Sequence, residues 1–140
     1  MSAYAKNRNI LLVEDSSDDV ELMKRKFKSR NIGGKLVVAK DGKEALDYLH
    51  EREKHGENEF PWLILLDIRM PKMNGIEVLK EIKSDEILKD IPVVMLTVST
   101  LDRDVFDSFN FGCNHYVAKS VGFEHFEDAL EPIINYYLGK

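Results

Sequence analysis

Acidic residues stand where two apolar runs of the chain end. Glu14 and Asp15 follow the run ILLV, and Asp67 ends the run WLILLD. Carboxylates at the end of a buried strand repel one another and resist dehydration, so a proton or a cation must relieve them. Mg2+ suits three carboxylates because it takes oxygen ligands and keeps some of its waters. These residues indicate a Mg2+ site.

The same part of the sequence could support the transfer of a phosphoryl group. A carboxylate held beside a metal can attack a phosphoryl donor, so Asp67 could form an acyl phosphate. Lys119 could pair with one phosphoryl oxygen, and the hydroxyl of Thr97, which ends PVVMLT, could donate to another. Taken singly, a strand-end Thr is more often a cap and a Lys after a strand is usually solvated. Together the residues predict a phosphoryl-accepting site.

Two further acids after Asp15 have a local explanation. Asp18 and Asp19 are interpreted as cap and first-turn charges, which are favourable at the positive end of a helix. A calcium-binding loop is excluded, because Val20 and Lys26 occupy the positions that need Gly and the final Glu.

Five short β-type runs must position these residues. They cover residues 9–13, 35–39, 62–66, 92–97 and 114–118, and several are nearly continuous in Ile, Leu and Val, as strands buried on both faces should be. Helical spacing between the runs predicts βαβ units, a parallel sheet and right-handed crossovers. Functional residues then gather at the carboxyl ends of the strands.

The intervening segments add detail to this α/β prediction. Met23 and Phe27 belong to one helical stripe, and Phe123, Phe126, Leu130, Ile133 and Tyr137 form another near the C-terminus. Pro132 should kink or restart the last helix. The polar segment 50–61 is interpreted as a surface extension.

Composition excludes several classes of protein. The net charge of -5 argues against a nucleic-acid-binding chain, and no apolar run is long enough for a membrane span or a signal peptide. A cytoplasmic location is expected, and the single Cys113 is interpreted as a small buried hydrophobe.

Four motifs resemble the receiver domain of two-component response regulators over nearly the whole chain. They are LLVED (11–15), LLDIRMPKMNG (65–75), IPVVMLT (91–97) and YVAK (116–119), with support from AKDGKEAL (39–46). The resemblance implies a flavodoxin-like (βα)5 three-layer sandwich with a parallel five-stranded sheet in the order 2-1-3-4-5. It also implies that residues 1–140 form one receiver domain with an eight-residue tail and no output domain.

The resemblance implies a role for each site residue. Asp67 would accept the phosphoryl group, and Mg2+ would be held by Glu14, Asp15, Asp67 and the backbone carbonyl of Arg69. Thr97 and Lys119 would contact the phosphoryl group. Tyr116 would be the aromatic switch residue near the output face.

Several residues depart from the pattern of the family. Ser120 follows Lys119 where most receivers have Pro, and Val98 follows Thr97 where Ala or Gly is usual. Arg69 and Ser99 lie where family members tune dephosphorylation, so an altered phosphoryl lifetime is expected. Phe109 and Phe111 are expected to pack beneath the fourth helix; the alternative is an aromatic docking face. His115 and His125 are given no chemistry.

The expected function is that of a response regulator in a phosphorelay. It would take a phosphoryl group from a sensor histidine kinase, of the type related to phytochromes, and bind a downstream protein. Signalling would use the face formed by the fourth helix, fifth strand and fifth helix, where a homodimer is also expected. The alternatives are a pseudo-receiver that binds partners constitutively, and a Mg2+-dependent phosphatase, a class that usually needs a second Asp at position 69.

Overall fold

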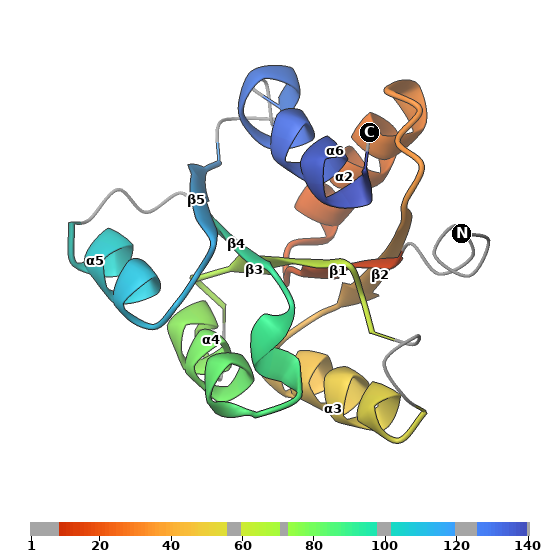
Figure 1. Cartoon of the computed structure of the whole chain (residues 1–140). Helices are drawn as coiled ribbons and strands as arrows, with labels where there is room; N and C mark the ends of the chain where they lie inside the picture. Colours follow the sequence, from red (N-terminus) through yellow and green to blue (C-terminus); the bar gives the residue numbers. More distant parts are fainter. Residues whose placement is uncertain (1–8, 56–59, 71–72, 98–101, 120–125, 140) are drawn as a thin grey trace.

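A computed structural model describes residues 9–55, 60–70, 73–97, 102–119 and 126–139 (Figure 1). The strands are β1 (Asn9–Val13), β2 (Lys35–Ala39), β3 (Leu63–Asp67), β4 (Val93–Thr97) and β5 (His115–Ala118). The helices are α2 (Ser17–Ser29), α3 (Gly42–Glu53), α4 (Gly75–Ser84), the 3-10 turn η2 (Leu88–Asp90), α5 (Asp102–Asn110), the π-helix η4 (Phe126–Leu130) and α6 (Glu131–Leu138).

The five strands form one parallel sheet in the order β2-β1-β3-β4-β5, as predicted. The three central strands are almost completely buried, which explains why their sequences are continuous in apolar residues. Val13 pairs with both Ala39 and Leu66, and Asp67 pairs with Leu96. This register places the polar residues that follow β1 and end β3 at the same edge of the sheet.

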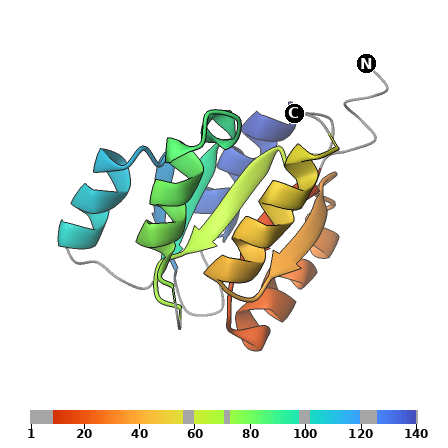
Figure 2. The ribbon, with the colours of Figure 1, turned by 90° about the horizontal axis from the view of Figure 1, so that it is seen from below.

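Helices cover both faces of the sheet, which gives three layers (Figures 1 and 2). On one face, Met23 and Phe27 of α2 and Ile134 of α6 pack against strand residues such as Leu12 and Leu65. The opposite face is covered by α3 and α4, whose buried side chains pack against the alternate residues of the same strands. Among the described residues, no helix is long and apolar enough to cross a lipid bilayer.

The C-terminal helical segment restarts at Glu131, directly before Pro132, as its sequence predicts. The π-helix η4 ends at Leu130, and Pro132 lies in the first turn of α6, where a missing N–H costs no hydrogen bond. The wider π turn shifts the helical phase. Phe126, Leu130, Ile134 and Leu138 are therefore the buried residues, whereas Ile133 and Tyr137, which were expected in the stripe, are only partly buried.

Candidate functional site

The acidic cluster lies where β1 and β3 end at the carboxyl edge of the sheet. The carboxylates of Glu14, Asp15 and Asp67 each offer a ligand oxygen, and these atoms lie within 4.8 Å of one another. Glu14 and Asp67 are buried, with 2% and 4% of their surface exposed, and Asp15 is exposed. The sequence prediction that these three acids meet is confirmed by this geometry, and oxygen donors of this kind fit a hard divalent cation.

Local hydrogen bonds fix the two strand ends. The Glu14 N–H donates to the carbonyl of Ala39, and the Ser16 N–H donates to Oε2 of Glu14 at 3.1 Å. Beyond β3, the Gly75 N–H donates to the carbonyl of Ile68 at 2.8 Å. A Cβ atom at Gly75 would collide with the backbone carbonyl of Asp67, so only glycine allows α4 to begin this close to the strand end.

Lys119 supplies the positive charge at the site. Its Nζ lies 2.8 Å from Oε1 of Glu14, 3.0 Å from Oδ2 of Asp19 and 3.4 Å from Oδ2 of Asp67, and the side chain is only 8% exposed. Lys119 therefore reaches the cluster as the sequence predicts. Asp19 is a site residue that the sequence analysis missed, because its place in the first turn of α2 already had a local explanation.

Burial and charge shift the protonation of these groups. Burial raises the pKa of Glu14 to about 7, although its hydrogen bond to Lys119 opposes the shift. Burial likewise raises the pKa of Asp67 above its usual range, against the attraction of Lys119. Burial alone would lower the pKa of Lys119, but the bonds to Glu14 and Asp19 and the nearby Asp67 raise it. The amine is therefore charged, and the cluster still favours a further cation.

Two other predicted site residues lie on the neighbouring strands. Thr97 ends β4 and pairs with Ala118, but its side chain is outside the described part of the chain, as are Val98, Ser99 and Ser120. Tyr116 lies in β5, is half-buried and packs against the core on the α3–α4 side of the sheet. The side chain of Arg69 contacts α5 through Asp104.

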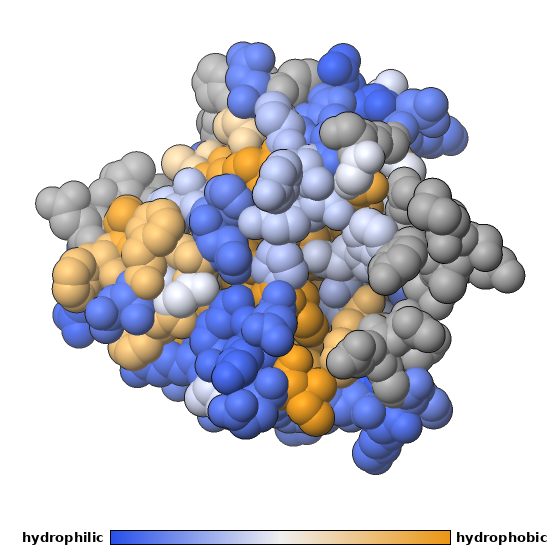
Figure 3. All heavy atoms as spheres, in the orientation of Figure 1, coloured by the Kyte–Doolittle hydropathy of each residue, from blue (hydrophilic) through white to orange (hydrophobic). Residues whose placement is uncertain are grey.

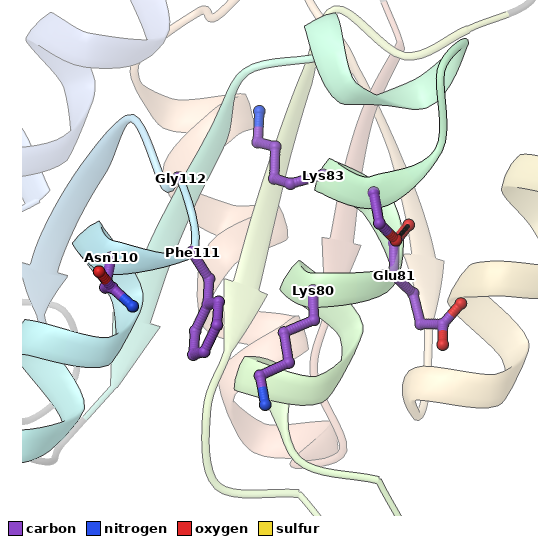
Figure 4. A pocket seen from close by; sticks show the side chains of 7 residues that line it. Lys80, Glu81, Lys83, Asn110, Phe111 and Gly112 are labelled. Carbon is purple, nitrogen blue, oxygen red and sulfur yellow. Dashed lines mark hydrogen bonds between the residues drawn. The ribbon is translucent and has the colours of Figure 1, made fainter.

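The aromatic residues of α5 and the turn after it divide between surface and core. Phe111 packs partly against the core and its ring lies 4.4 Å from Nζ of Lys80, beside a hollow between α4 and α5 (Figure 4). Phe109 is 52% exposed and Phe106 is 68% exposed. The expectation that Phe109 packs beneath this helix is therefore wrong. Figure 3 shows hydrophobic surface gathered over α5.

His115 has a partner that the sequence did not reveal. Its Nε2 lies 3.0 Å from the hydroxyl of Tyr137, and the two rings meet edge to face. The pair joins β5 to α6 and has a structural role, whereas His125 lies outside the described residues.

Comparison with known proteins gives one consistent result. The response regulator receiver domain family matches residues 10–131. The probable methanogenesis regulatory protein FilR2 of Methanothrix harundinacea is 42% identical over 130 residues, which are 93% of this chain and 83% of that protein. The crystal structure of the phosphorylated cyanobacterial phytochrome response regulator RcpA aligns with a TM-score of 0.82 at 36% identity, covering 94% of each chain.

A second solved structure bears on the acidic cluster. The Mn(2+)-bound form of response regulator Rcp1 aligns with a TM-score of 0.73 at 36% identity, over 94% of this chain and 90% of that one. It shows a divalent ion on a protein with this fold.

Proposed function

Because the chain belongs to the response regulator receiver domain family, we propose that Asp67 accepts a phosphoryl group from the phosphohistidine of a sensor histidine kinase. The observation that carries this proposal is the buried carboxylate of Asp67 at a strand end, with Lys119 at 3.4 Å and two further carboxylates beside it. A parallel sheet does not need three acids and a buried lysine at one edge to be stable, so these residues favour a functional site.

In the transfer step, the bond that forms at Asp67 is matched by the bond that breaks in the phosphohistidine. A carboxylate oxygen of Asp67 attacks the phosphorus, the P–N bond of the phosphohistidine breaks, and its electron pair stays on the imidazole nitrogen. The amine of Lys119 is placed to pair with a phosphoryl oxygen, for which it would exchange part of its contact with Glu14. We assign a similar contact to the hydroxyl of Thr97.

Mg2+ fits the same site. We propose that Glu14, Asp15, Asp67 and the backbone carbonyl of Arg69 hold the ion, a set of oxygen donors supported by the clustering of the three carboxylates. When bound, Mg2+ would screen the charge of the approaching phosphoryl oxygens. The Mn2+ in the Rcp1 structure supports a divalent ion in proteins of this family.

We further propose that phosphorylation changes the surface made by α5, β5 and α6. Tyr116 would be the switch residue, since it lies half-buried in β5, which is part of this face. Exposed aromatic side chains on the two helices, Phe106, Phe109 and Tyr136, support a protein-binding role. The partner would bind one of two pre-existing conformations more tightly, and a homodimer through this face is one such complex.

The likeness to RcpA, a phytochrome response regulator, supports a kinase of the phytochrome-related type as phosphoryl donor.

The net charge of -5 argues against nucleic acid as the downstream partner. We propose that the exchange takes place in the cytoplasm, where a single reduced cysteine is the common pattern.

Intact-mass measurement after incubation with acetyl phosphate, with and without Mg2+, tests the proposal. One phosphoryl adduct that needs Mg2+ and disappears in the Asp67→Asn variant is expected. If no adduct forms, the same assay with a phosphorylated histidine kinase decides between exclusion of the small donor and a pseudo-receiver. No transfer from either donor would overturn the proposal and leave a constitutive binding module.

A further inference from the structure

A second group of metal-ligating side chains lies at the far end of the molecule from the acidic cluster. His50 and Glu53 are in the last turns of α3, and Asp85 is the C-cap of α4. The two helices lie side by side (Figures 1 and 2). A ring nitrogen of His50 and one carboxylate oxygen from each acid lie within 4.8 Å of one another.

Local contacts hold these three side chains in place. Nδ1 of His50 is 2.7 Å from Oε1 of Glu53, whose side chain is only 18% exposed. Oδ1 of Asp85 accepts hydrogen bonds from the N–H groups of Ile87 at 2.8 Å and Leu88 at 3.0 Å. These bonds orient the Asp85 carboxylate and use only one of its two oxygens. The ligand atoms are therefore preorganised by backbone and helix geometry.

The charges at this cluster favour a divalent cation. Two carboxylates from different helices face one imidazole, and Lys54 and Lys89, which are close in the sequence, pair with Glu51 and Glu86. Mg2+ and Ca2+ prefer oxygen donors alone, whereas imidazole with carboxylates suits Zn2+. Three protein ligands would leave one position of a tetrahedral ion for water.

We propose that His50, Glu53 and Asp85 form a Zn2+ site that joins the C-terminal ends of α3 and α4. The site uses none of the residues assigned to phosphoryl transfer, and it does not depend on that function. The ion replaces the contact between His50 and Glu53 with three coordinate bonds, and so clamps the two helices together.

Calorimetric titration of the whole chain with Zn2+, in excess Mg2+ to occupy the acidic cluster, tests the site. The critical variant is His50→Ala, and its matched control is His55→Ala, which removes an exposed histidine on the same helical end that lies 3.9 Å from Glu51. We expect one Zn2+ per chain, with affinity reduced about tenfold or more in His50→Ala and unchanged in His55→Ala. Asp85→Asn should weaken binding similarly, because the amide oxygen can retain the two backbone hydrogen bonds while the ligand charge is lost.

Thermal unfolding provides an independent measurement. An ion that binds only the folded state raises the melting temperature, so Zn2+ should stabilise the wild-type chain and His55→Ala more than it stabilises His50→Ala. Equal Zn2+ affinity in the two histidine variants, or no binding by the wild-type chain, would overturn the proposal. Circular dichroism of each variant without metal separates lost binding from lost folding.

Discussion

Arg69 and Asp104 join the loop after β3 to α5: Nη2 of Arg69 lies 2.6 Å from Oδ2 of Asp104. The arginine is two residues beyond Asp67, and the side chain of Asp104 is 13% exposed. The Ser108 hydroxyl donates to the carbonyl of Asp104, which holds this part of α5 in the helix. This ion pair therefore ties the loop at Arg69 to the first turn of α5.

Replacing Arg69 with Gln should loosen α5 without unfolding the protein. Because the arginine is half-exposed, the loss of overall stability should be below about 1 kcal/mol. Amide hydrogen exchange should become faster in α5 and stay unchanged in α2. Arg103→Gln is the control, because Arg103 makes a weaker pair at 3.9 Å with Asp107 on the same helix. Equal exchange rates in both variants would show that the Arg69 contact does not restrain α5.

Lys119→Met should destabilise the metal-free protein by about 3 kcal/mol, because buried Glu14 and Asp67 lose their cation. Mg2+ should restore part of the stability. Urea unfolding with and without Mg2+ measures both effects. Lys40→Met is the control, since Lys40 follows β2 at the same edge of the sheet and is exposed. A Lys119 variant as stable as the Lys40 variant would contradict this account of the charge balance.

Asp19→Asn should weaken Mg2+ binding about fivefold. Loss of the carboxylate at 3.0 Å from Lys119 leaves the positive charge of the lysine less compensated beside the ion. Asp18→Asn removes the same charge from the same helical turn and should change the affinity less than about twofold. Calorimetric titration with Mg2+ compares the two, and equal losses would mean that only the overall charge of the turn matters.

Cys113 should react slowly in the folded protein. It is 7% exposed, and burial raises the pKa of its thiol to about 11, so about one molecule in a thousand carries a thiolate at pH 8. Iodoacetamide at pH 8 should label Cys113 rapidly only in denaturant, as followed by mass. Rapid labelling of the native chain would show that the turn after α5 opens.

Much of the fold could be predicted because its strands carry strong signals. A run such as ILLV at residues 10–13 has no polar face, so it must be covered on both sides, and a parallel sheet follows from helices between such runs. The same topology brought Glu14, Asp67 and Lys119 together, since parallel strands end at a common edge. The sequence was therefore sufficient to predict that residues at the ends of these strands lie near one another.

Features that depend on helix phase or on distant partners could not be predicted. Phe109 and Phe111 are two residues apart, and only the end of α5 decides which one points inward. The π turn before α6 moved the buried positions to Ile134 and Leu138. Asp19 gave no signal, because its contact with Lys119 spans 100 residues and a first-turn acid already has a local explanation.

The bond between Lys119 and Glu14 joins residues 105 positions apart. β5 is the last of the described strands along the chain, so the residues that carry the acids of the cluster are synthesised before the lysine. The nascent protein would then hold these carboxylates without the amine that balances their charge. A product terminated before β5 would therefore lack the buried cation of this cluster.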